Sequence, residues 1–178
     1  AVLDSFEAGQ SWLVKLALKL AHRFNRNTRK GSQVNIAAHY DLGNEFFQLF
    51  LDPTMMYSSA IFMRPTMTLE AAQVARLDHI CRKLDLTARD HLLEIGTGWG
   101  GMALYAARHY GCRVTTTTLS QAQYELTSER VRAAGLNERI TLLRKDYRDL
   151  DGVYDKLVSI EMIEAVGHDF YDTYFAKC

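Results

Sequence analysis

The sequence predicts an α/β fold with a doubly wound parallel sheet, and three observations support this. Short apolar runs alternate with helical segments from residue 91 to the end of the chain, as expected for parallel strands joined by crossover helices. A short apolar run with a carboxylate near its end, residues 92–95, leads into four glycines within six residues. Polar residues follow each expected strand, at the edge of the sheet where such folds bind ligands. We therefore expect one ligand-binding crevice at the carboxyl ends of the strands.

Composition limits the possible function classes. The chain has 178 residues, 48% of them hydrophobic and 24% charged, with a formal net charge of zero, which fits a globular domain and gives no indication of a nucleic-acid partner. Cys81, Cys112 and Cys178 show neither metal nor redox spacing, so we expect no metal site and a reducing cytoplasm. No apolar run approaches the roughly 18 residues of a membrane span. The first residue is not Met and the end looks helical, so we expect a piece of a longer protein.

Residues 1–67 are expected to form an N-terminal helical lid segment. Within it, residues 11–26 read as an amphipathic helix with Trp12, Leu16 and Leu20 on one stripe, and residues 11–30 hold six Lys or Arg and no acid. Such a helix can lie on an anionic bilayer or pack on its own domain. Residues 33–63 are dense in aromatic residues and include His39, Tyr40 and Asp41 in a row. Within them, residues 45–51 are expected to form a short helix with Phe46, Phe47 and Phe50 on its apolar side. The aromatic residues predict either a lid over an apolar pocket or a packed helical cap.

Residues 68–178 are expected to form the α/β domain. Thr68 and Ser120 are candidate helix N-caps, and Gly135 is a candidate helix end. Strands are expected at residues 91–95, 113–118, 140–143 and 154–160, and helices at 68–84, 99–110, 120–134 and from about 170 onward.

The glycine turn after the first strand is the main ligand-binding candidate. Gly96, Gly98 and Gly101 satisfy the G-x-G-x-x-G dinucleotide pattern, but that pattern also needs an acidic residue at the end of the second strand. That strand ends in the threonines 115–118 instead, and the carboxylate is Glu94. A negative charge there suits an ammonium or sulfonium ligand, so we favour S-adenosylmethionine over a nicotinamide cofactor. A glycine-rich turn without a ligand is the plainer alternative.

Residues at the other strand ends extend this cradle. Thr118 and Gln123 suit ribose hydroxyls, Asp146 can accept from an adenine amino group, and Tyr147 can stack on the adenine ring. Asp146 has a second interpretation as a surface turn residue. Glu161, Glu164 and His168 would share one face if their segment is helical, where a carboxylate could stabilise positive charge; alternatively, they are acids at a helix N-terminus.

Taken together, five segments of the chain resemble one family. They are residues 35–47 with His39-Tyr40-Asp41, 52–62, 94–101, 118–123 and 159–168. From about Gln33 to its end, the chain resembles the cyclopropane-fatty-acyl-phospholipid synthase family, which includes the mycolic acid cyclopropane synthases and related fatty-acyl methyltransferases. The resemblance implies the Rossmann-like fold of class I methyltransferases, incomplete here at its C-terminus.

The resemblance also implies a reaction and a set of site residues. The C=C bond of an unsaturated acyl chain attacks the methyl group of S-adenosylmethionine, and the resulting carbocation closes to a cyclopropane ring or ends as a methyl or methylene branch. A bound bicarbonate takes the proton in ring-forming members, and Glu164 matches the glutamate that holds it. Candidate catalytic residues are Glu164, Tyr57, His39 and Ser59. Candidate cofactor-binding residues are Tyr57, Ser58, Glu94, Gly96, Gly98, Thr118, Leu119, Gln123, Asp146, Tyr147 and Ile160.

Two departures from the family pattern affect these expectations. Many ring-forming members carry Cys where this chain has Ser59, which leaves a branch-forming relative open. The family also continues past Cys178, so we expect this chain alone to have little or no activity. The expected partner is an unsaturated phospholipid at the inner membrane face, with no prediction of oligomeric state. The alternatives are a small-molecule N-methyltransferase or a cofactor-binding module without chemistry.

Overall fold

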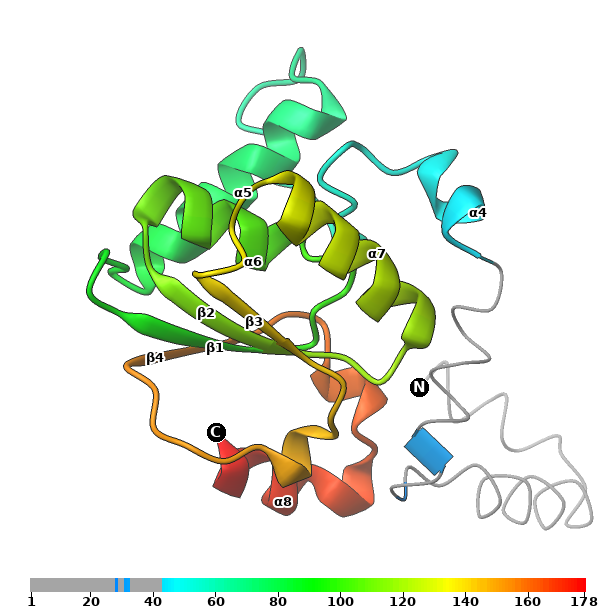
Figure 1. Cartoon of the computed structure of the whole chain (residues 1–178). Coiled ribbons are helices and arrows are strands. Elements are labelled where there is room, and N and C mark those ends of the chain that lie inside the picture. The colour runs from blue at the N-terminus through cyan, green and yellow to red at the C-terminus, as the bar shows by residue number, and fades with distance from the viewer. Residues whose placement is uncertain (1–27, 29–30, 33–42) are drawn as a thin grey trace, which may run out of the picture.

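The computed structural model describes residue 28, residues 31–32 and residues 43–178. These form a four-stranded sheet with helices on both faces (Figure 1). The expected helix at residues 11–26 and the His39-Tyr40-Asp41 triplet lie outside the described residues. The expected α/β fold with a parallel sheet is confirmed.

The sheet is built from β1 (His91–Ile95), β2 (Arg113–Thr117), β3 (Ile140–Leu143) and β4 (Lys156–Ser159). Its order is β3-β2-β1-β4 and every pair is parallel. The chain moves outward from β1 to β3 and then crosses back to place β4 on the other side of β1. The direction of winding therefore reverses between β1 and β4, and ligands bind at such a switch point beyond the carboxyl ends of the strands.

One face of the sheet is covered by α5 (Leu69–Lys83), α6 (Gly101–Tyr105) and α7 (Gln121–Ala133), which lie above the strands in Figure 1. Thr68 Oγ1 caps α5 by accepting from the Ala71 backbone N–H, and the Ser120 side chain caps α7 by accepting from that of Gln123. Both caps were expected from the sequence. The core on this face includes Leu77, Cys81, Leu92, Met102, Ala103, Ala106, Cys112, Val114, Val131, Ile140 and Val158.

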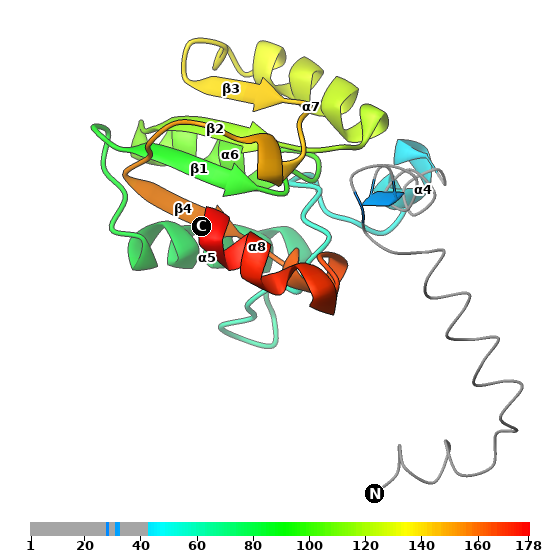
Figure 2. The ribbon, with the colours of Figure 1, turned by 90° about the horizontal axis from the view of Figure 1, so that it is seen from below.

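The other face carries α8 (Tyr171–Lys177), which lies below the strands in Figure 1 and near β4 in Figure 2. It packs against the 3-10 turn η2 (Tyr147–Asp149), and the rings of Tyr147 and Tyr174 meet edge to face at 5.3 Å between centroids. Leu93 and Ile95 of β1 point to this side. Adjacent residues of β1 thus serve two cores, which explains why Leu92, Leu93 and Ile95 are all apolar.

Two expected helices differ from the structure. The helix expected at 99–110 consists of α6 and a π-helical turn, η1 (Ala106–Tyr110). The π-turn brings Tyr105 and Tyr110 to the same acceptor, Asp78 Oδ1, at 3.4 Å and 2.7 Å from their hydroxyls. The short helix expected at 45–51 is α4 (Asn44–Gln48), and of its three expected apolar contacts only Phe47 is buried, whereas Phe46 and Phe50 are exposed.

The segment after β4 is not one helix. It contains two 3-10 turns, η3 (Ile163–Ala165) and η4 (His168–Phe170), separated by Gly167 at φ 83°. Glu161 precedes both turns and has a positive φ of 48°. The condition for Glu161, Glu164 and His168 to share a helical face is therefore not met, because a left-handed glycine interrupts the helical path.

Candidate functional site

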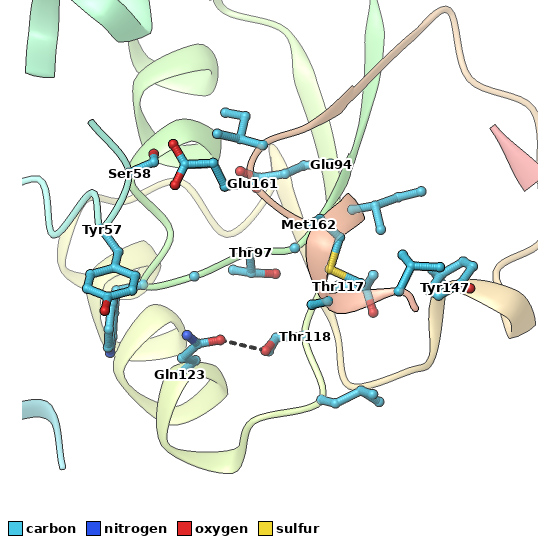
Figure 3. Close-up of a pocket in the computed structure, with 18 of the residues that line it drawn as sticks. Tyr57, Ser58, Glu94, Thr97, Thr117, Thr118, Gln123, Tyr147, Glu161 and Met162 are labelled. Atoms are coloured by element: carbon cyan, nitrogen blue, oxygen red, sulfur yellow. Dashed lines mark hydrogen bonds between the residues drawn. The ribbon is translucent and has the colours of Figure 1, made fainter. Parts of the chain in front are cut away.

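A pocket of about 480 Å³ opens at the carboxyl ends of β1, β2 and β4. Its position is the switch point of the sheet, where the strand order favours a ligand site. Figure 3 shows many of its lining side chains, with Tyr57 and Tyr147 toward opposite ends. The lining residues are Ser32, Met55, Met56, Tyr57, Ser58, Glu94, Ile95, Gly96, Thr97, Gly98, Trp99, Thr117, Thr118, Leu119, Gln123, Lys145, Asp146, Tyr147, Ile160, Glu161, Met162, Glu164, Ala165 and Val166.

The glycine turn forms the floor of the pocket between β1 and α6. Gly96, Gly98 and Gly100 all have positive φ, at 99°, 53° and 83°, a conformation that glycine adopts without steric cost. A Cβ on Gly98 would have no protein atom within 4 Å, so the space beside the backbone is open at this position. The backbone of the turn is therefore exposed to whatever occupies the pocket.

Glu94 is a buried carboxylate at the edge of this floor. Its side chain is 3% exposed, and Thr116 Oγ1 donates to Glu94 Oε2 at 2.6 Å. Thr116 Oγ1 also lies 2.7 Å from the hydroxyl of Thr97. Burial raises the pKa of Glu94 to about 8, and the hydrogen bond from Thr116 opposes that rise. A cationic group brought into the pocket would stabilise the ionised carboxylate and displace its proton.

The threonine-rich end of β2 orients polar groups around the pocket. Thr117 Oγ1 donates to the Lys145 carbonyl at 2.5 Å, and Thr118 Oγ1 donates to Gln123 Oε1 at 2.8 Å, the contact dashed in Figure 3. Because Gln123 Oε1 accepts from Thr118, the amide group of Gln123 presents its N–H donors to a ligand. Such a donor suits the oxygen of a hydroxyl group, the ribose role expected for this residue.

Asp146 and Tyr147 lie beyond β3, where an arginine holds them. Arg148 donates through Nε to Asp146 Oδ1 at 2.8 Å and through Nη2 to Oδ2 at 2.6 Å, a bidentate pair. The same guanidinium lies 5.5 Å from the centroids of the Tyr147 and Phe170 rings. This hydrogen bonding raises the pKa of Arg148. The expected adenine contact of Asp146 would thus use a carboxylate whose orientation Arg148 already sets.

An aromatic cluster closes the opposite end of the pocket. Phe47, Tyr57 and Trp99 meet with ring centroids 4.7 Å to 6.4 Å apart. Trp99 is 2% exposed, and its Nε1–H donates to Asn44 Oδ1 at 2.7 Å. The ring of Tyr57 is half exposed. One side of this end therefore consists of aromatic rings, and such rings attract cations and apolar chains.

The segment 52–58, which carries Tyr57 and Ser58, is fastened to the α/β domain from two helices. Arg130 of α7 donates to the carbonyls of Pro53, Thr54 and Trp99 at 2.9 Å, 3.2 Å and 2.5 Å. Gln73 of α5 donates to the carbonyl of Ser58 at 2.7 Å and to that of Met56 at 3.2 Å. This part of the expected lid is therefore a fixed wall of the pocket.

Most of the site residues expected from the sequence come together here. All eleven candidate cofactor-binding residues line the pocket, as does Glu164, which is exposed at its mouth. Ser59 is exposed and does not line the pocket, and His39 lies outside the described residues. Roles for these residues stay predictions.

Sequence reasoning missed several residues of the site, above all Trp99, Arg130 and Arg148. An aromatic residue among four glycines could have identified Trp99 as part of the turn's packing. No local signal marks the two arginines, which act on segments brought to them by the fold.

Two further features of the described residues limit the site. Across residues 43–178 and the three described residues before them, no group of three or more His, Cys, Asp or Glu is placed to hold a metal ion. Among the helices in the same part of the chain, none has both the length and the apolar character to cross a bilayer.

The fold and the position of the pocket define the class of the protein: it has the class I methyltransferase fold. Within that class, the chain belongs to the mycolic acid cyclopropane synthetase family, whose family model matches residues 27–178. The resemblance noted from the sequence is thereby confirmed.

Three similar proteins illustrate the family. A probable fatty acid methyltransferase of Pseudomonas putida is 51% identical over 135 residues, which is 75% of this chain and 34% of that protein. The cyclopropane-fatty-acyl-phospholipid synthase of Escherichia coli (strain K12) is 44% identical over 156 residues, which is 88% of this chain and 40% of that protein. The crystal structure of mycolic acid cyclopropane synthase CmaA1, complexed with SAH and CTAB, has a TM-score of 0.78 and 38% identity, covering 82% of this chain and 51% of that one. The chain thus spans about half or less of the length of these relatives.

Proposed function

We propose that this chain is the cofactor-binding part of an S-adenosylmethionine-dependent methyltransferase that modifies the C=C bond of an unsaturated fatty-acyl chain. The observation that carries the proposal is the pocket at the switch point, where a buried carboxylate, an open glycine turn and an aromatic wall converge. Support comes from the relatives, among which one structure contains SAH and two names refer to fatty-acyl substrates.

The residues present fit the cofactor. Glu94 supplies a negative charge for the ammonium group, and Gly98 leaves room for the methionine portion against the backbone. Gln123 directs its amide N–H groups toward the ribose, and Tyr147 lies where an adenine ring could pack. When bound, S-adenosylmethionine supplies an electrophilic methyl group. Among the described residues that line the pocket, the rings of Tyr57 and Trp99 and the carboxylate of Glu164 can stabilise positive charge near it.

The substrate and place of action are part of the same proposal. We propose an acyl chain of a phospholipid as methyl acceptor, reached at a membrane surface, with either a cyclopropane ring or a methyl or methylene branch as the product. The basic residues 11–30 support a peripheral association with anionic lipid. A bicarbonate held near Glu164 as the proton acceptor comes from the family resemblance alone.

Binding calorimetry on the 178-residue chain is the first test. We expect saturable binding of S-adenosylmethionine and none of NAD, because β2 ends in threonines, without the acidic residue that would hold a ribose of NAD. Binding of NAD alone would overturn the methyltransferase assignment. Binding of neither ligand would overturn the assignment of this chain as the cofactor-binding part.

The substrate is tested with methyl-labelled S-adenosylmethionine and two acceptors. Vesicles of dioleoylphosphatidylglycerol test the acyl chain, and a small secondary amine tests an N-methyltransferase. We expect the chain alone to give little or no turnover, and a protein extended to the family's full length to label the acyl chains. The Glu164→Gln variant of that longer protein should bind S-adenosylmethionine normally and lose turnover. Labelling of the amine alone would overturn the lipid assignment.

A further inference from the structure

A buried arginine lies directly behind the pocket wall and joins two of its segments. Arg76 of α5 is 9% exposed, and its Nη1 donates to Ser58 Oγ. Its Nη2 lies 3.9 Å from Oε1 of Glu161, which follows β4. Ser58 and Glu161 both line the pocket although they are far apart in the sequence. Arg76 is therefore the structural link between the aromatic wall and the end of β4.

The charge of Arg76 is only partly balanced by Glu161. The side chain of Glu161 is 50% exposed and the contact is longer than a hydrogen bond, whereas the Arg76 side chain is 11% exposed. Burial lowers the pKa of Arg76, and Glu161 raises it. A buried guanidinium is stabilised by a close carboxylate partner. Because Glu161 compensates the charge of Arg76 only in part, positive charge remains close to Ser58. An anionic group in the pocket would gain from it.

Ser58 is held in one orientation by α5. Its Oγ accepts from Arg76, and its backbone carbonyl accepts from Gln73 Nε2 at 2.7 Å. Because the hydroxyl oxygen accepts from Arg76, the hydroxyl hydrogen is directed elsewhere, and the adjacent charge makes it a stronger donor. A hydroxyl donor beside a cation is suited to a carboxylate.

Glu161, which follows β4, faces the same end of the pocket as Ser58. In Figure 3 the side chains of Ser58, Glu161 and Glu94 lie on one side of the view, away from Gln123 and Thr118. Glu161 has a backbone φ of 48°, which is unfavourable for a residue with a Cβ and must be held by its surroundings. Its carboxylate lies beside Arg76, with 3.9 Å between Oε1 and Nη2.

We propose that Arg76 is a positioning residue that makes Ser58 the hydroxyl donor for the carboxylate of the cofactor's amino-acid group, while Glu94 takes its ammonium group. This inference rests on the proposed function, because it requires a ligand that carries both charges. The ammonium group of the cofactor would then lie near the buried Glu94, and its carboxylate would lie near the buried Arg76 with Ser58 between them. Arg76 acts through Ser58 and does not itself touch the reacting atoms.

The test compares two ligands that differ only in the carboxylate: S-adenosylmethionine and decarboxylated S-adenosylmethionine. In calorimetry on the whole chain, Arg76→Met should weaken binding of the first about tenfold or more and change binding of the second by less than about twofold. Arg82→Met is the matched control, since Arg82 is an exposed arginine of the same helix. It should leave both affinities unchanged.

The outcomes separate this inference from the proposed function. Equal losses for both ligands in Arg76→Met would show a structural role only, and no loss for either would remove Arg76 from the site; each overturns the inference. If Arg76→Met does not fold by circular dichroism, Ser58→Ala replaces it, and unchanged discrimination between the ligands in that variant overturns the inference as well. A wild-type chain that binds neither ligand would overturn the proposed function itself.

Discussion

The floor of the pocket and the wall opposite it are built in different ways. The floor is the turn from Gly96 to Gly101, whose shape follows from backbone conformations that glycine permits. The opposite wall, residues 52–58, contains no glycine and is shaped from outside, by Arg130 of α7 and by Gln73 and Arg76 of α5. A locally encoded surface and a surface assembled from distant side chains thus enclose the same ligand site. The two should respond differently to mutation.

The largest effect on stability is expected at Gly101, where the floor touches the wall. A Cβ on this residue would lie 2.6 Å from Met56 Sδ and 2.7 Å from the carbonyl oxygen of Thr54. Because the carbonyl is backbone held by Arg130, it cannot move freely, and Gly101→Ala should lower the free energy of unfolding by about 3 kcal/mol. Urea denaturation measures this.

Gly135→Ala is the control for Gly101→Ala. Gly135 has a φ of 66° and open space around its Cβ position, so this substitution costs only the left-handed conformation, about 1 kcal/mol. If Gly101→Ala lowers the free energy of unfolding no more than Gly135→Ala does, the floor and the wall are not in tight contact at Gly101.

A smaller but still large effect is expected for Arg130→Met. The change leaves the carbonyls of Pro53, Thr54 and Trp99 without the guanidinium that now serves all three. We expect a loss of about 2 kcal/mol in stability and weaker binding of S-adenosylmethionine, since the wall that carries Tyr57 is released. The exposed Arg132 of the same helix gives the control Arg132→Met. Reduced stability with full affinity would mean that the wall keeps its shape without Arg130.

Glu94 predicts an effect that depends on pH. Its folded-state pKa of about 8 lies above the usual 4.5, so the folded chain binds a proton that the unfolded chain has lost between these values. Stability should therefore fall as pH rises through this window, by up to about 1.4 kcal/mol per unit. Glu94→Gln should flatten this slope, as thermal unfolding at a series of pH values would show.

Ligand binding should reverse the preference of Glu94. A cofactor ammonium favours the ionised carboxylate, so binding should release a proton and tighten as pH rises from 6 toward 8. Calorimetry in two buffers of different ionisation enthalpy counts that proton. Binding without proton release in the wild-type chain would contradict the assigned contact.

The smallest effect is expected at Ser59, next to the anchored wall residue Ser58. Its side chain is exposed and does not line the pocket. Ser59→Ala should change stability by less than about 0.5 kcal/mol and leave S-adenosylmethionine affinity within twofold. A tenfold loss of affinity would contradict this expectation and would show that Ser59 contributes to cofactor binding.

The contrast between the floor and the wall also explains which residues could be found from the sequence. Glu94, Gly98 and Gln123 were identified because each stands at a fixed offset from the end of a strand, and parallel strand ends meet at one edge of the sheet. Tyr57 and Ser58 were identified as cofactor contacts only through the family resemblance, since the aromatic density of residues 33–63 left a lid over a pocket and a packed helical cap equally open. Their supports, Arg76 and Arg130, lie on helices whose periodicity shows only that one face is buried.

The sequence by itself determined the alternation of strands and helices, the caps at Thr68 and Ser120, and the glycine turn, because each depends on residues close together in the chain. The tertiary structure alone decided that β4 lies beside β1, that segment 52–58 faces the turn, and that Arg76 stands behind Ser58. These relations depend on which surfaces meet after folding. The contact between a buried charged side chain and its distant partner leaves no regular spacing in the sequence.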